Sequence, residues 1–266
     1  MSADPFPQRI VCLTEEPTEV LYRIGQSDRI VGISGFTVRP TKARREKPKV
    51  SAFTSAKIGR ILDLKPDLVI GFSDIQADIA QALIKVGVEV WIANHRSVQG
   101  ILGYCLRLAY MVGEPEQGRQ LYAEMEATID SVRLKAAALP RQPRVYFEEW
   151  DEPRISAIQW VSELIGIAGG VDVFAERGKS SLAKGRILET DDEVFAAAPE
   201  VLIGSWCGKR FSPRKVRERE GWGQVPAVRD NELHEIKSPL ILQPGPAALL
   251  DGLPALHEII ANAARS

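Results

Sequence analysis

The sequence predicts an α/β fold of two β-α-β lobes with parallel sheets, bridged by one long backbone helix. Short, continuously apolar strands alternate with helix-like segments, which is typical of parallel sheets covered on both faces. One pattern of helix, proline, strand and glycine occurs twice, and a long amphipathic segment lies between the two copies. The length of 266 residues suits two lobes of about 110 to 125 residues each.

The first copy of the repeat occupies the N-terminal part of the chain. Residues 9–13 read as a strand, 14–17 as a loop and 18–25 as a helix closed by a glycine. Residues 58–71 then give a helical pattern that stops before Pro66, followed by a strand that ends in glycine.

The second copy follows the same order. Residues 144–147 read as a strand, 148–160 as a loop and 161–169 as a helix. Residues 193–204 repeat the helix, a proline at Pro199, a buried strand and a glycine. Two similar lobes follow from this repetition.

Residues 116–139 between the two copies predict a single helix of about 24 residues, roughly 36 Å long. Apolar residues at spacings of three and four form one face. They are Leu121, Met125, Ile129, Val132 and Ala136. We therefore expect an N-terminal lobe over residues 1–112, an interlobe helix over 113–140 and a C-terminal lobe over 141–266.

The composition excludes several classes of protein. A net charge of -1 with 45% hydrophobic and 26% charged residues gives no reason to expect nucleic acid binding. The one basic run, residues 42–49, is expected to be a solvated loop. No segment approaches the roughly 18 apolar residues of a membrane span, so no membrane insertion is expected. The three scattered cysteines predict free thiols, and we expect a monomer.

In order and spacing, the segments of this chain resemble the helical-backbone class of substrate-binding proteins of ABC importers, which capture vitamin B12, ferric siderophores and haem. The resemblance covers nearly the whole chain and is strongest to the cobalamin-binding branch. It rests on residues 9–13 with the helix start at 18–21, and on 28–33, 64–71, 113–116, 169–174 and 198–203.

The resemblance implies a non-catalytic protein that captures a corrinoid of the vitamin B12 type in an interlobe cleft, as a component of ABC-type import. It implies no cofactor of the protein's own, with cobalamin or a related corrinoid as the ligand. Two alternatives remain: a cytosolic corrinoid carrier or salvage protein, and a ferric siderophore or haem binder. Members of the family are periplasmic or surface-anchored, whereas residues 1–9 lack the pattern of a signal peptide and by themselves predict a cytoplasmic protein.

Ligands of open α/β sheets bind beyond the carboxyl ends of the strands, so the residues after each strand are the candidates. A corrin is a broad, mostly apolar disc, which aromatic faces can hold and which a few hydrogen-bonding groups can orient. The predicted ligand-binding residues are Thr14, Glu15, Phe36, Phe53, Phe72, Ser73, His95, Arg96, Trp150, Trp160 and Trp206. Trp206 is the sharpest of these predictions because Gly204 and Ser205 favour a turn at the strand end.

Each of these residues also has an ordinary structural interpretation. A large aromatic side chain at a strand end is more often part of the core. His95 could reach a metal centre, but a polar loop residue is the commoner case, and His234 and His257 lie too far away in sequence to complete a metal site. A siderophore cleft usually needs several cations, and Arg96 is the one cation among these candidates.

Enzyme motifs are missing from the sequence, and no catalytic residue is assigned. There is no glycine-rich nucleotide fingerprint, no phosphate-binding loop and no nucleophile elbow. Glu148 and Glu149 could be a general acid and base, but adjacent residues on a strand would point to opposite faces. Cys207 has no histidine nearby in sequence to activate it.

The resemblance also implies one acidic residue on each lobe that docks to arginines of a membrane permease. Asp192, with its neighbours Asp191 and Glu193, is the candidate in the second lobe. The corresponding region of the first lobe is the basic run, in which Glu46 is the acidic candidate.

Overall fold

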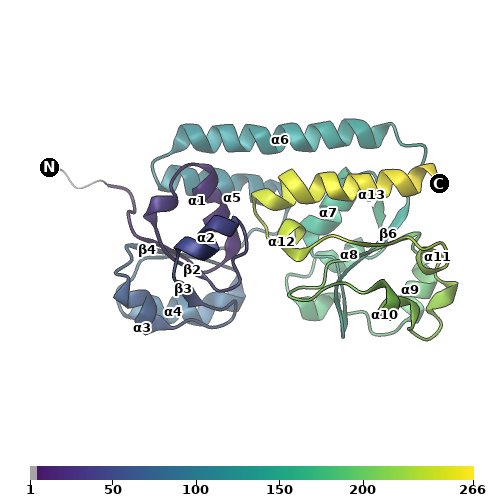
Figure 1. Cartoon of the computed structure of the whole chain (residues 1–266), viewed down its shortest axis with the longest axis horizontal. Coiled ribbons are helices and arrows are strands. Elements are labelled where there is room, and N and C mark those ends of the chain that lie inside the picture. The colour runs from purple at the N-terminus through teal and green to yellow at the C-terminus, as the bar shows by residue number, and fades with distance from the viewer. Residues whose placement is uncertain (1–4) are drawn as a thin grey trace. The chain divides into compact units, whose positions relative to one another are not determined.

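The computed structural model describes residues 5–266 and divides into two compact units. The first unit contains the described residues up to His95 together with Gln99–Glu124, and the second contains Arg96–Val98 and Met125–Ser266. Each unit has its own sheet with helices around it (Figure 1). The predicted α/β class with two lobes is confirmed. Within residues 5–266, no helix combines the length and apolarity needed to cross a membrane.

The first sheet has five strands in the order β3-β2-β1-β4-β5, all parallel. Its strands are β1 Ile10–Cys12, β2 Ile30–Ser34, β3 Lys49–Ser51, β4 Leu68–Phe72 and β5 Val90–Ala93. Val11, Val50 and Val69 pack on one face against helices α3 and α4. Ile10 and Cys12 on the opposite face are also fully buried. Burial on both faces explains why these strands are continuously apolar.

The helices and turns of this part of the chain follow the strands in the predicted alternation. They are α1 Glu15–Arg23, η1 Ser27–Arg29, α2 Thr41–Glu46, α3 Ile58–Asp63, η2 Asp74–Gln76, α4 Ala77–Lys85 and α5 Val98–Met111. Gly25 closes α1 at φ +78°, and the next amide, that of Gln26, donates to Leu21 O at 2.7 Å. The predicted glycine C-cap is therefore present.

Two local expectations in the first unit are wrong. Helix α1 begins at Glu15, so the predicted loop over 14–17 is mostly helical; Pro17 is tolerated because the first turn needs no intrahelical amide donors. The basic run is not a solvated loop, because Thr41–Glu46 forms α2 around a fully buried Ala43. Lys42 and Glu46 form an i,i+4 ion pair at 3.7 Å that supports this short helix.

The long helix α6 runs over Pro115–Ala137, close to the predicted 116–139. Leu121, Met125, Ile129 and Val132 of the predicted apolar face are buried. The boundary between the two units falls inside this helix, after Glu124. Residues of α6 are thus part of both units.

The second sheet has the order β10-β9-β6-β7, with β8 also paired to β6. Its strands are β6 Arg144–Asp151, β7 Arg154–Ser156, β8 Val171–Asp172, β9 Val201–Gly204 and β10 Leu233–Glu235. The expectation of an entirely parallel sheet is wrong here, because β6 and β7 form an antiparallel hairpin across the turn that joins Asp151 to Arg154. The other pairs are parallel.

The remaining helices and helical turns surround this second sheet. They are α7 Gln159–Ile167, α8 Ala175–Gly178, η3 Ala183–Arg186, α9 Asp192–Ala197, α10 Pro213–Arg217, η4 Trp222–Gln224, α11 Pro226–Arg229, α12 Ser238–Ile241, η5 Ala248–Gly252 and α13 Leu253–Arg265. Tyr146, Leu202, Trp206 and Trp222 belong to one buried apolar cluster in this unit. This cluster holds β6 and β9, whose carboxyl ends carry candidate residues.

Candidate functional site

We call the residues that follow β1 to β5 the first rim, and those that follow β6, β9 and β10 the second rim. The first rim exposes large apolar side chains. Phe36 follows β2 and is 62% exposed, and Phe53 follows β3 and is 37% exposed. Their loops adjoin, since Gly35 N donates to Ser51 O at 2.7 Å. Both side chains are therefore accessible at the rim, and their role in ligand binding stays a prediction.

Gln76 holds the first rim together, and the sequence analysis missed it. Its buried Oε1 accepts a hydrogen bond from Phe72 N at 2.9 Å, and its Nε2 donates to Phe53 O at 3.0 Å and to Leu13 O at 3.4 Å. One amide thus connects the segments after β1, β3 and β4. The sequence carries one indication of this close contact, the glycine at position 71. A Cβ on Gly71 would stand 2.5 Å from Gln76 Oε1.

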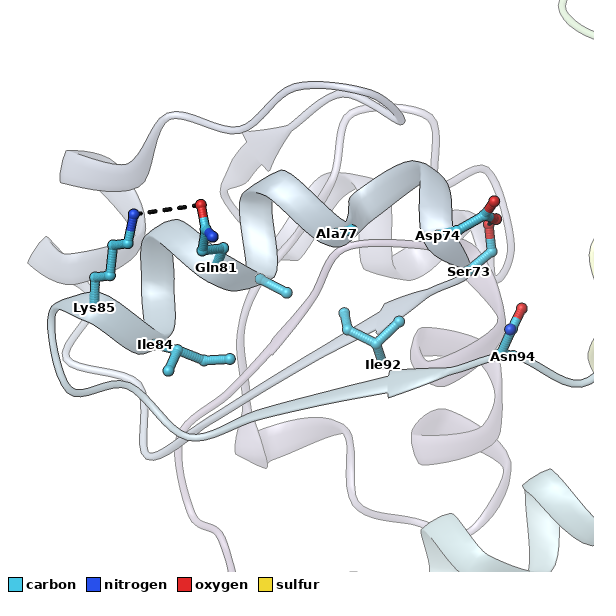
Figure 2. A pocket seen from close by; sticks show the side chains of 9 residues that line it. Ser73, Asp74, Ala77, Gln81, Ile84, Lys85, Ile92 and Asn94 are labelled. Carbon is cyan, nitrogen blue, oxygen red and sulfur yellow. Dashed lines mark hydrogen bonds between the residues drawn. The ribbon is translucent and has the colours of Figure 1, made fainter.

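Ser73 lies at one end of a cavity of about 510 Å³ between α4 and the edge strand β5. Its backbone takes φ +67°, and its hydroxyl accepts a hydrogen bond from Ile75 N at 3.3 Å. In Figure 2, Ser73, Asp74 and Asn94 stand at one end of this cavity, and the hydrogen-bonded Gln81 and Lys85 at the other. The cavity runs along the flank of the sheet, and one of its ends belongs to the rim.

Phe72 and His95 form part of an internal aromatic stack. The His95 ring lies 4.5 Å from Tyr104 at 21° and 5.2 Å from Phe72 at 69°. Phe72 is 5% exposed and His95 8% exposed. His95 lies in a loop after β5, as the structural interpretation expected, but it is buried in this stack instead of exposed. Among residues 5–266, no group of three or more histidine, cysteine or acidic side chains is arranged to hold a metal ion.

Thr14, Glu15 and Glu16 are buried at the start of α1. Glu15 Oε2 accepts a hydrogen bond from Val38 N at 2.6 Å, and Glu16 Oε1 accepts one from Thr14 Oγ1 at 2.6 Å. Burial raises the pKa of each glutamate to about 7, against the smaller opposing effects of these hydrogen bonds. The two carboxyls therefore fix loops of the rim and carry little negative charge below neutral pH.

Glu148, within β6, is the centre of a buried polar cluster that includes Trp206 of the second rim. Both of its carboxylate oxygens accept hydrogen bonds from Arg219, at 2.7 and 2.9 Å. Trp206 Nε1 and Tyr146 Oη each donate to it at 2.9 Å. A fully buried carboxylate with four donors is satisfied internally, so Glu148 is not free for acid-base chemistry.

The neighbouring Glu149 has a different partner. Arg186, which is 2% exposed, donates to Glu149 Oε2 at 2.5 Å. The two glutamates therefore pair with arginines from different segments, as expected for adjacent residues of a strand. The pKa of the Cys207 thiol is raised, mainly by desolvation and also by Glu149, so nothing favours its nucleophilic thiolate form.

The three candidate tryptophans differ in position. Trp160 was expected in a loop, which is wrong: it lies in α7, is 3% exposed and donates to Ile241 O at 2.9 Å. Trp206 is also 3% exposed, yet its side chain borders a cavity. Trp150 is half-buried on β6, with Lys209 Nζ 4.1 Å from its ring centroid. Lys209 Nζ also lies 5.2 Å from the Trp206 ring and pairs with Asp151.

The remaining predicted residues lie on or near the surface. Arg96 is half-buried and belongs to the second unit. Glu46 on α2 is exposed and accepts a hydrogen bond from Tyr22 Oη at 3.2 Å, and Asp192 is exposed at the start of α9. A role for Glu46 and Asp192 in docking a permease stays a prediction.

Two α/β units that share a long helix, with apolar and charged side chains gathered at the strand ends, define a binding protein of the class that serves ABC importers. The sequence profile of the periplasmic binding proteins matches residues 10–240. The chain belongs to this family.

Relatives match most of the chain. The vitamin B12-binding protein of Vibrio campbellii is 26% identical over 246 residues, covering 89% of this chain and 84% of the relative. An uncharacterised ABC transporter substrate-binding lipoprotein of Bacillus subtilis is 22% identical over 263 residues, covering 96% and 80%.

Solved structures share the fold. The periplasmic haem-binding protein RhuT from Roseiflexus has a TM-score of 0.81 at 25% identity and covers 95% of this chain and 99% of its own. The vitamin B12-binding protein BtuF of Vibrio cholerae has a TM-score of 0.79 at 22% identity and covers 98% and 100%. The named relatives and neighbours are binding proteins.

Proposed function

We propose that this chain is a non-catalytic substrate-binding protein of ABC-type import and that its ligand is a corrinoid of the vitamin B12 type. The observation that carries the proposal is the pair of exposed phenylalanines, Phe36 and Phe53, on adjoining loops of the first rim. Large exposed aromatic groups at strand ends suit a broad apolar ring. The similarity to vitamin B12-binding proteins over 89% of the chain supports the same ligand class.

Haem is the second candidate ligand. It is also a flat macrocycle, and the haem-binding protein RhuT is 25% identical with a TM-score of 0.81. Because both rings would use the same aromatic surface, the two ligands must be compared directly.

Titration of the purified protein with cyanocobalamin and with haemin, followed by absorption and calorimetry, tests the proposal. We expect cobalamin to bind. Phe36→Ala and Phe53→Ala should each lower the affinity for cobalamin about tenfold or more, because aromatic anchors carry much of the affinity of such surfaces. Leu134→Ala removes a 77% exposed side chain on α6 and should leave binding unchanged. Tighter binding of haemin than of cobalamin would favour the second candidate, and binding of neither would reject the proposal.

A further inference from the structure

A second cavity lies entirely within the second unit, where β9 and β10 end. These strands are parallel neighbours, with Gly204 paired to Glu235, so the segments after them leave the same edge of the sheet. The cavity has a volume of about 510 Å³. It is lined by Trp206, Gly208, Lys209, Arg210, Glu235, Ile236, Lys237, Ser238 and Pro239. This is the position at which open α/β sheets bind ligands.

The charge of this cavity is unbalanced. Three of its side chains are cationic and one, Glu235, is acidic, and Glu235 Oε1 already accepts a hydrogen bond from Phe211 N at 3.0 Å. Lys209 is neutralised by its ion pair with Asp151. Arg210 and Lys237 are exposed and have no side-chain hydrogen bond or ion pair with any residue of the described chain. Two cations are therefore available on the cavity wall.

The arrangement favours an anion attached to an apolar body. A guanidinium and an ammonium group on one wall offer charge-assisted hydrogen bonds to a phosphate or carboxylate, and Arg210 can engage two oxygens at once. Trp206 supplies an apolar wall of the same cavity. The turn at Gly208, with φ +77°, leads the chain from Trp206 to Arg210, whereas Lys237 comes from the segment after β10.

We propose that the cavity beyond β9 and β10 binds an anionic group of the ligand, a phosphodiester or a carboxylate, through Arg210 and Lys237. This inference rests on the proposed function and specifies in addition that the ligand carries a negative charge. A corrinoid with its nucleotide loop supplies a phosphodiester, whereas haem supplies carboxylates, so the same cations could serve either source.

The variants Arg210→Gln and Lys237→Gln remove one charge each while keeping polar side chains. Lys215→Gln is the matched control, because Lys215 is exposed on α10 of the same unit and does not line the cavity. Each protein is titrated by calorimetry with cyanocobalamin, with cobinamide, which lacks the phosphodiester and nucleotide, with haemin and with haemin dimethyl ester. Inorganic pyrophosphate, followed by phosphorus NMR, probes the anion site without any macrocycle.

We expect Arg210→Gln and Lys237→Gln each to lower the affinity for cobalamin about tenfold and to leave the affinity for cobinamide unchanged. The charge-assisted hydrogen bond that each variant loses can form only with the phosphodiester, which cobinamide lacks. If the two variants instead bind haemin more weakly than the parent does, but bind haemin dimethyl ester equally well, the anion is a carboxylate. In both cases pyrophosphate should bind the parent and the Lys215→Gln control, and bind both cavity variants more weakly.

The two proposals fail in different ways. Equal binding of the macrocycles by parent and variants, with no binding of pyrophosphate, overturns the anion site and leaves the proposed function standing. Pyrophosphate binding that depends on Arg210 and Lys237, in a protein that binds no macrocycle, supports the anion site and rejects the proposed function. Binding of none of these probes overturns both.

Discussion

Glu148 shows how much of the second rim depends on a single side chain. It is fully buried, and its four hydrogen bonds come from Arg219, Trp206 and Tyr146. Arg219 in turn lies over Trp222, with its guanidinium carbon 4.4 Å from the ring centroid. The carboxylate thus holds Trp206 in place as a wall of the cavity beyond β9 and β10.

Glu148→Ala should lower the free energy of unfolding by about 3 kcal/mol, because it leaves the partly buried Arg219 charge without its partner. Urea denaturation followed by tryptophan fluorescence measures this loss. Glu220→Ala, at an exposed position on the same unit, should change stability by less than about 0.5 kcal/mol. Equal effects of the two substitutions would show that the buried pair contributes little.

Glu15 and Glu16 should make the stability of the protein depend on pH. Burial raises the pKa of both carboxyls from the ordinary 4.5 to about 7. The stabilisation from holding these protons is complete below about pH 4.5 and is lost as pH rises through 7, because the unfolded chain releases them first. Urea midpoints measured across this range should therefore fall with rising pH.

The double variant Glu15→Gln, Glu16→Gln should flatten this dependence, since glutamine does not titrate. The exposed pair Glu124→Gln, Glu126→Gln on α6 serves as the control. A pH profile that is the same in the parent and in the Glu15 and Glu16 variant would contradict the assignment.

At the scale of elements, the strands and the long helix could be predicted from periodicity, while their connections could not. The helix over residues 116–139 could be predicted because the residues of its apolar face are close together in sequence. The extension of β6 through Glu148 and Glu149 has no local signal, because the arginines that neutralise these carboxylates lie 71 and 37 residues away. Trp160 was predicted in a loop because the predicted helix began at Val161, two residues after the observed start of α7 at Gln159.

For the candidate site, the sequence predicted the strand-end position of several residues but not their burial, and a binding role for them stays a prediction. Strand ends carry the exposed Phe36 and Phe53, as expected from the general position of ligands in α/β sheets. Burial of Phe72, His95, Trp160 and Trp206 could not be predicted from their own positions, because it depends on which distant side chains cover them. Arg210 and Lys237 were missed because nothing in their local sequence marks them as free of acidic partners.

Gln76→Leu should loosen the first rim, because it removes the amide that connects the segments after β1, β3 and β4. Leucine keeps the approximate volume but leaves the amide of Phe72 without its acceptor, which costs about 1 to 3 kcal/mol. Hydrogen exchange at residues 52–55 and 72–75 should become faster. Gln81→Leu, on the exposed side of α4, should leave exchange in both segments unchanged.

At the scale of the whole molecule, α6 is the element that both units have in common. Glu126→Pro, at an exposed position within the helix, should lower the free energy of unfolding by about 3 kcal/mol or more, because proline removes a hydrogen bond and clashes with the preceding turn. Urea denaturation followed by circular dichroism tests this, with Glu126→Ala as the control. A stability equal to that of the control would show that α6 tolerates a break.

The shared helix has a consequence for biosynthesis. Once Glu124 has been translated, the sequence of the first unit is complete, and this domain can fold while the ribosome is still working. The next segment of the nascent chain carries Met125, Ile129 and Val132, whose burial belongs to a unit that does not yet exist. Until the rest of the second unit emerges, this apolar stripe is exposed to solvent, so it is the segment of the unfinished polypeptide that we expect chaperones to cover.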